Sequence, residues 1–204
     1  MEALLVVDVQ NDFCPGGALA VPDGDAVVPV INALIARAPH VLQTQDWHPR
    51  GHVSLASTHA GRKPYDVVVT PYGEQILWPD HCLAGTRGAA FRDDLDTTRT
   101  ELVLRKGHRV GVDSYSAFYE NDHATPTGLH GYLSERGIRR VVLCGLATDF
   151  CVKWSATDAR RLGYDVVVVR DAVRGIDVAG SLARAWEEMR AAGVTFARAE
   201  EVWR

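Results

Sequence analysis

The chain has 204 residues, a net charge of −4 and a hydrophobic content of 47%, which fits one domain with a substantial core. Its acidic balance offers no basic face for nucleic acid. The N-terminal apolar run is too short for a signal peptide or a membrane span, and no other segment approaches about 18 apolar residues, so we expect a cytoplasmic protein with a small-molecule substrate.

The first half of the chain predicts a strand, a helix, a second strand and a long irregular stretch. Nearly continuous runs of branched apolar residues predict strands over 3–9 and 40–45, as in parallel sheets covered on both faces. Apolar residues at helical spacing predict a helix over 25–38. Residues 46–100 are rich in His, Pro, Gly and Thr, and a loop of this length is usually functional, although 66–70 should pair locally.

The second half alternates strands and helices. Apolar runs predict further strands over 101–106, 140–145, 165–170 and 194–199. Helical patterns cover 127–137, 148–163 and 178–193. The alternation predicts one α/β domain over 1–204, doubly wound around a parallel sheet, with an insertion at about 46–100.

Polar residues follow the predicted strands at the edge where such folds bind ligands. Asp8, Asp46 and Lys106 come at the ends of the first three strands, and the loop after the fourth leads to Cys151. Because ligands of open α/β sheets bind outside the carboxyl ends of the strands, we expect these four residues at one rim.

Cys151 is a candidate nucleophile. It lies in the first turn of the predicted helix 148–163, where the helix dipole would lower the thiol pKa from about 8.5 and backbone N–H groups could hold an oxyanion. The alternative is a buried structural thiol, which we expect for Cys144. No histidine follows a nearby strand, so Asp8, with a pKa raised by burial, is the candidate base, and Lys106 would orient it.

The stretch "QDWHPRGH" (45–52) indicates a metal site. It places Asp46, His48 and His52 within seven residues, and His81 follows in the same insertion. Carboxylate and imidazole ligands suit zinc, iron or manganese. A polar loop without a metal is the alternative for the stretch alone, and His81 favours the metal.

Five motifs occur in order along the chain: "DVQNDF" (8–13), "DWHPRGH" (46–52), "WPDHC" (78–82), "RKG" (105–107) and "GLATDFCV" (145–152). Together they resemble the nicotinamidase/pyrazinamidase branch of the isochorismatase-like cysteine hydrolases over nearly the whole chain. The resemblance implies a three-layer α/β/α sandwich around a mainly parallel, six-stranded sheet. It also implies hydrolysis of nicotinamide to nicotinate and ammonia in NAD salvage, with pyrazinamide as a further substrate.

The resemblance assigns roles to particular residues. The catalytic triad would be Asp8, Lys106 and Cys151, and the oxyanion hole would be the backbone N–H groups of Ala147 and Cys151, after a cis peptide at Leu146–Ala147. Phe13 and Trp78 would sandwich the pyridine ring. One divalent metal ion would be bound by Asp46, His48 and His81, with water completing the ligand set and His52 left out of it. The ion would be zinc, with iron or manganese as alternatives.

Two other functions stay open. One is another amidohydrolase of the superfamily, acting on carbamoyl or ureido substrates, although such relatives generally lack the Asp-x-His motif. The other is a non-catalytic metal-binding or thiol redox protein on the same scaffold. Whether the chain forms a homo-oligomer is open as well.

Overall fold

A six-stranded sheet forms the centre of the computed structural model, which describes residues 1–203. The strand order is β5-β2-β1-β6-β7-β8, and all five pairings are parallel. The strands are β1 (Glu2–Val7), β2 (Val41–Asp46), β5 (Thr100–Lys106), β6 (Arg140–Leu146), β7 (Asp165–Arg174) and β8 (Thr195–Ala197). Each lies on a predicted apolar run, which confirms the predicted sheet.

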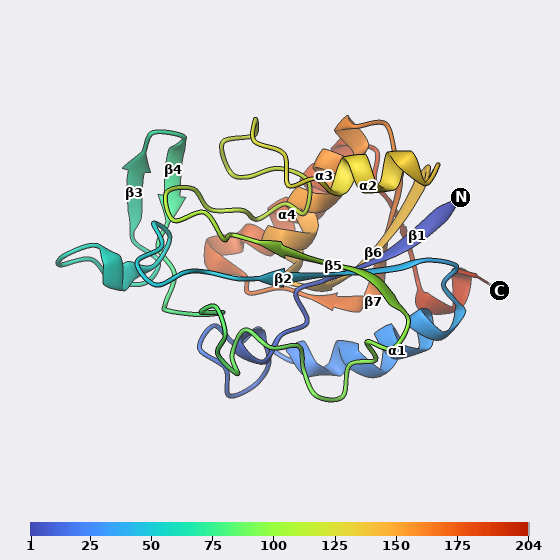
Figure 1. Ribbon diagram of the computed structural model, residues 1–204, viewed down its shortest axis with the longest axis horizontal. Coiled ribbons are helices and arrows are strands. Elements are labelled where there is room, and N and C mark those ends of the chain that lie inside the picture. The colour runs from blue at the N-terminus through green and yellow to red at the C-terminus, as the bar shows by residue number, and fades with distance from the viewer. Residues whose placement is uncertain (204) are drawn as a thin grey trace.

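Helices cover both faces of this sheet, giving the three-layer α/β/α arrangement (Figure 1). On one face lies α1, and on the other lie α2, α3 and α4. Their bounds are α1 (Val28–Arg37), α2 (Leu129–Glu135), α3 (Lys153–Arg161) and α4 (Ser181–Ala191). Within residues 1–203, no helix has the length and apolar character needed to cross a membrane.

Burial explains why the strand sequences are so apolar. From Ala3 to Val7, β1 is at most 2% exposed, because it lies in the middle of the sheet with helices on both sides. The prediction that the strands are covered on both faces is wrong for β5, where Glu101, Val103 and Arg105 are exposed. The reason is its position: β5 is an edge strand, and one of its faces is open to solvent.

The stretch between β2 and β5 folds mostly as loops. It contains a short 3-10 turn, Ala56–Thr58, and an antiparallel hairpin of β3 (Val67–Thr70) and β4 (Gly73–Ile76), which confirms the local pairing predicted there. The hairpin stands beyond the end of the sheet that lies away from the N-terminus (Figure 1). The beginning and the later part of this stretch contact each other, because the His48 N–H donates to the Cys82 carbonyl at 3.0 Å.

Candidate active site and metal centre

Four adjacent strands bring the predicted polar residues together. The register of β2 and β5 places Asp46 opposite Lys106 at the carboxyl ends of both strands. Asp8 follows β1, which lies beside β2, and Cys151 follows β6, on the other side of β1. Residues up to 143 positions apart in the sequence therefore meet at one rim, as the fold class predicts.

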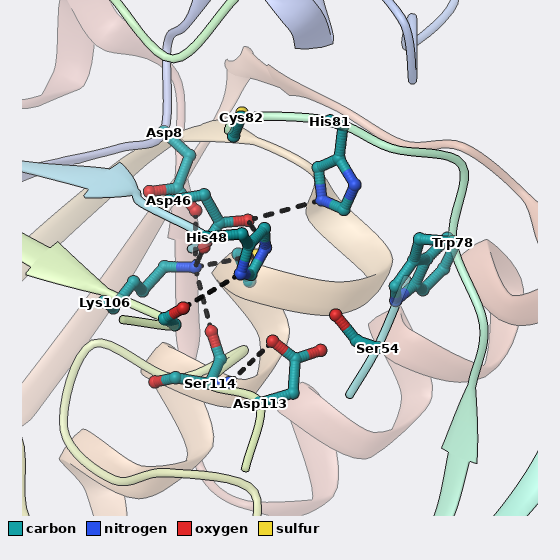
Figure 2. Close-up of polar contacts among 12 residues, drawn as sticks. Asp8, Asp46, His48, Ser54, Trp78, His81, Cys82, Lys106, Asp113 and Ser114 are labelled. Carbon is teal, nitrogen blue, oxygen red and sulfur yellow. Dashed lines mark hydrogen bonds and ion pairs between the residues drawn. The ribbon is translucent and has the colours of Figure 1, made fainter. Parts of the chain in front are cut away.

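The Lys106 ammonium lies at the centre of this group (Figure 2). Its Nζ is 2.5 Å from Asp46 Oδ1 and 2.8 Å from Asp8 Oδ2. The same nitrogen donates to the Ser114 carbonyl at 3.0 Å and lies 3.3 Å from the Cys151 sulfur. One buried cation thus contacts the candidate base, the candidate nucleophile and a candidate metal ligand.

Thr44 orients the Asp8 carboxylate. Its hydroxyl donates to Asp8 Oδ1 at 2.6 Å and accepts the Asp8 backbone N–H at 3.2 Å. The other oxygen, Oδ2, lies within ion-pair distance of Lys106 but makes no aligned hydrogen bond to any of residues 1–203. Oδ2 therefore keeps a lone pair available for a proton.

The two carboxylates beside Lys106 differ in acidity. Burial raises the pKa of Asp8 above its ordinary value, as predicted, although the charge of Lys106 acts the other way. Burial acts on Asp46 too, but Lys106 and His48 hold its pKa well below the ordinary value. Burial alone would lower the pKa of Lys106, and the two carboxylates raise it well above the ordinary value. Asp46 is therefore the permanent counter-ion, and Asp8 is the carboxylate suited to exchange a proton.

Cys151 differs from its prediction in two respects. It lies in a π-helical turn, Thr148–Val152, which precedes α3, rather than in the first turn of an α-helix. Burial raises its pKa well above the ordinary value, so the expected lowering is wrong. The desolvation of a 5% exposed residue exceeds the opposing effect of Lys106. A thiol with a raised pKa needs a base to take its proton before it can act as a nucleophile.

A pocket opens in front of this sulfur. The peptide bond Leu146–Ala147 at its edge is cis, as expected from the resemblance. The lining includes seven of the predicted site residues, whereas Asp8 and Lys106 do not line the pocket and are fully buried. The pocket is lined by Phe13, Leu19, Asp46, His48, Trp78, His81, Asp113, Tyr115, Ala147, Phe150, Cys151 and Ile176.

Aromatic side chains dominate the wall of the pocket. Phe13 packs its ring edge against His81, with centroids 5.5 Å apart. Trp78 lies edge-on to Phe150 at 4.8 Å and donates its indole N–H to the Tyr115 hydroxyl at 3.1 Å. Tyr115 and Phe150 were missed as individual site residues, although Tyr115 lies in the segment "SYSAF" (114–118), which the resemblance places at the border of the pocket, and Phe150 is next to Cys151.

Asp46, His48 and His81 form a set with the chemistry of a metal site. Their candidate ligand atoms all lie within 4.8 Å of one another, and Asp46 Oδ2 is 3.6 Å from His48 Nε2 and 3.8 Å from His81 Nε2. Figure 2 shows both imidazoles approaching this carboxylate from the side away from Lys106. One oxygen of Asp46 therefore serves Lys106, and the other is shared with the histidines.

Hydrogen bonds at the far side of each imidazole fix its tautomer. His48 Nδ1 lies 3.0 Å from the Gly107 carbonyl, and His81 Nδ1 lies 2.8 Å from the Pro79 carbonyl. A carbonyl only accepts, so each Nδ1 donates its hydrogen there, and Nε2 is the ring nitrogen that faces Asp46 and is placed to bind a metal. These residues fit a divalent ion.

His52 has different partners. Its Nδ1 lies 2.8 Å from the Ser54 hydroxyl and its Nε2 lies 3.3 Å from the Val112 carbonyl. Its ring centroid lies 4.4 Å from that of His48, with the two rings tilted by 36°. Although His48, His52 and Asp113 also lie close enough to form a ligand set, both ring nitrogens of His52 are already hydrogen-bonded. We keep His52 outside the ligand set.

Comparisons with known proteins agree with these features. A family model for the isochorismatase domain matches residues 2–201. A nicotinamidase from Acinetobacter baylyi is 52% identical over 192 residues, which cover 94% of this chain and 90% of the relative. These findings confirm the resemblance read from the five motifs.

Solved structures extend the comparison. A nicotinamidase/pyrazinamidase from Acinetobacter baumannii superposes with a TM-score of 0.97 and 49% sequence identity, covering 98% of this chain and 97% of that one. A pyrazinamidase from Pyrococcus horikoshii in complex with zinc gives a TM-score of 0.77 and 36% identity, covering 97% of this chain and 98% of the other.

Proposed function

The chain belongs to the isochorismatase family, and on that premise we propose that it is an amidohydrolase that converts nicotinamide to nicotinate and ammonia, a step of NAD salvage, and also accepts pyrazinamide. The observation that carries the proposal is the position of the Lys106 ammonium. It contacts Asp8, Cys151 and Asp46, and so joins a proton acceptor, a nucleophile and a metal ligand in one buried group.

Bond formation begins with Asp8 and Cys151. Asp8 takes the thiol proton, and the sulfur attacks the amide carbon. Lys106 stabilises the charge while it moves from carboxylate to sulfur, since it contacts both groups. The oxyanion is held by the backbone N–H groups of Ala147 and Cys151, each contributing about 3 kcal/mol in comparable sites.

Bond breaking reverses the proton transfer. Asp8 returns its proton to the leaving nitrogen, ammonia departs, and the acyl group stays on Cys151 as a thioester. Water then attacks the thioester, its proton goes to Asp8, and nicotinate leaves as the thiol is restored. The raised pKa of Asp8 suits a group that both accepts and donates a proton in each cycle.

We propose that Asp46, His48 and His81 hold one divalent metal ion, zinc rather than iron or manganese, in view of the zinc-bound relative. When bound, the ion supplies a Lewis-acid site for the ring nitrogen, and so aligns the carboxamide with the sulfur. Phe13 and Trp78 would flank the ring from the pocket wall. The protein residues, rather than the ion, supply the nucleophile.

The alternatives account for fewer features. A carbamoyl or ureido group does not require an aromatic ring beside it, so these substrates give no reason for the aromatic wall and the nearby ligand set. A non-catalytic protein would have no use for a buried carboxylate, ammonium and thiol in mutual contact, which are costly to desolvate.

Ammonia release tests the proposal. We expect the metal-loaded chain to release ammonia from nicotinamide, and a chelator to weaken substrate binding. Cys151→Ala should lower turnover to background while the bound metal stays at the level of the unaltered chain. Release from ureido compounds but not from nicotinamide would support the first alternative, and no turnover of any amide would support the second.

A further inference from the structure

We infer that Gln10 and Asp12 are positioning residues of the metal centre: Gln10 holds the backbone of Asp46, and Asp12 holds the segment that carries His81. The inference rests on the metal site proposed above and adds two residues that contact neither metal nor substrate. Both lie in the segment 8–13, which leaves β1 and also contains Asp8 and Phe13.

Gln10 makes two hydrogen bonds to the backbone of one residue. Its Nε2 donates to the Asp46 carbonyl at 2.8 Å, and its Oε1 accepts the Asp46 N–H at 2.8 Å. The same Nε2 also donates to the Ala89 carbonyl at 2.8 Å. The side chain is fully buried, and its amide orientation is fixed because it must offer a donor and an acceptor to one peptide backbone.

The strand register explains why Asp46 needs this partner. On one side, Asp46 pairs with Lys106 of β5. On the other side, the ladder between β1 and β2 runs only to Val6 and Gln43, so Asp46 lies beyond the last paired residues. The Gln10 amide takes the place of the missing strand and satisfies buried backbone groups that would otherwise lack partners.

Asp12 acts on the second ligand-bearing segment. Its Oδ2 accepts the Cys82 N–H at 2.7 Å, and its Oδ1 accepts the Ala18 N–H at 3.2 Å. Cys82 directly follows His81, and its φ of +45° is uncommon for a residue other than glycine. The Cys82 carbonyl accepts the His48 N–H. Cys82 is thus held from both sides.

These contacts matter because the ligands come from segments 33 or more residues apart. Asp46 and His48 belong to one segment and His81 to the other, and both imidazoles must be held close to the same carboxylate oxygen for the three residues to bind one ion. Metal sites need ligand distances correct to within about 0.2 Å, and outer-sphere partners typically change metal affinity by about 10- to 100-fold.

Matched glutamine variants test the role of Gln10. The metal-free chain would be titrated with Co²⁺, followed by its visible absorption, and with Zn²⁺ in competition with a chromophoric chelator. Gln10→Met should weaken both affinities by about 10- to 100-fold. Gln43 is the control: it is equally buried and donates to the Asp96 carbonyl, away from the ligands. Gln43→Met should keep both affinities within about threefold of the unaltered chain.

Gln10→Glu covers the case in which Gln10→Met does not fold. It keeps the length, the polarity and the acceptor for the Asp46 N–H, but a carboxylate cannot donate to the Asp46 carbonyl. We expect weakened Co²⁺ binding here too. A Co²⁺ affinity equal to that of the unaltered chain would overturn the role of Gln10, as would equal losses in Gln10→Met and Gln43→Met.

Matched aspartate variants test Asp12. In Asp12→Asn an amide hydrogen would face one of the two N–H groups, so we expect weaker Co²⁺ binding and an altered Co²⁺ spectrum. Asp80 is the control, because it precedes His81 but is exposed, and within residues 1–203 it accepts only the Ser57 hydroxyl. Equal Co²⁺ affinities in Asp12→Asn and Asp80→Asn would overturn the role of Asp12. If the unaltered chain bound neither metal, the proposed metal centre itself would fall, and this inference with it.

Discussion

Thr44 binds Asp8 Oδ1 and so leaves Oδ2, which makes no aligned hydrogen bond within residues 1–203, as the oxygen free to accept a proton. In Thr44→Val the side chain keeps its shape but loses both hydrogen bonds to Asp8. A hydrogen bond to a charged group is worth about 1.5–3 kcal/mol, so we expect kcat to fall about tenfold or more. KM and bound metal should stay unchanged, and steady-state kinetics with metal analysis would check both.

A control for this substitution lies on β5. The Thr100 hydroxyl is buried and has no hydrogen-bond partner among residues 1–203. Thr100→Val should therefore leave kcat unchanged and stabilise the fold slightly. If Thr44→Val retained full kcat, Asp8 would not depend on its hydroxyl partner.

At the scale of single residues, the charged groups could be predicted and their partners could not. Asp8 and Lys106 stand out because a charge at the end of an apolar run needs an explanation. Thr44 and Gln10 look like ordinary strand and loop residues in the sequence. Their roles depend on where β1 ends relative to β2, which is a property of the pairing rather than of either segment.

The end of β5 positions a metal ligand through a glycine. Gly107 has a φ of +64°, and its carbonyl accepts the His48 Nδ1–H. A Cβ at this position would come within 2.8 Å of His48 Nδ1 and closer still to the neighbouring ring carbon. We expect Gly107→Ala to displace the imidazole and weaken Zn²⁺ binding by about 10- to 100-fold, as measured by competition with a chelator.

Gly51→Ala is the control that distinguishes a steric clash with His48 from the loss of stability caused by a non-glycine residue at positive φ. Gly51 has a similar positive φ of +78°, but a Cβ there would meet nothing within 4 Å. Both variants should lose stability, by about 1 kcal/mol for a non-glycine residue at positive φ. Only Gly107→Ala should lose Zn²⁺ affinity, and equal affinities would refute the contact with His48.

Among the elements, the strands and helices followed from hydrophobic patterns, but the turn at Cys151 did not. The pattern from 148 to 163 is helical, and nothing in it distinguishes a π turn from an α turn. The prediction for the pKa of Cys151 was wrong for a similar reason. The sequence indicates that Cys151 lies near the start of a helix, but the depth of its burial depends on Lys106, Asp8 and the surrounding sheet. The positions of Tyr115 and Phe150 in the pocket wall likewise depend on how distant segments pack against each other.

For the whole molecule, metal binding should be linked to folding, because the ligand set exists only when two distant loop segments meet. A ligand at about 100 times its Kd stabilises the native state by about 2.7 kcal/mol. For a chain of this size, that raises Tm by roughly 5–10 °C. Thermal unfolding with Zn²⁺ and with excess chelator measures the difference.

His81→Ala shows whether the stabilisation comes from this set. It removes the ligand from the second segment and leaves Asp46 and His48 in place, so the Tm difference between Zn²⁺ and chelator should largely vanish. A difference of undiminished size in His81→Ala would mean that Zn²⁺ stabilises the chain at another location.

The strand order has a consequence for redesign. Asp8, Asp46, Lys106 and Cys151 lie on or just after four neighbouring strands, β1, β2, β5 and β6, whereas two of the four aromatic residues of the pocket, Trp78 and Tyr115, come from loops outside these segments. The sheet thus carries the reacting residues, and loops outside it carry part of the wall that contacts the substrate ring. Replacing these loops on an unchanged sheet would therefore change which amide the pocket binds and leave the reacting residues in place.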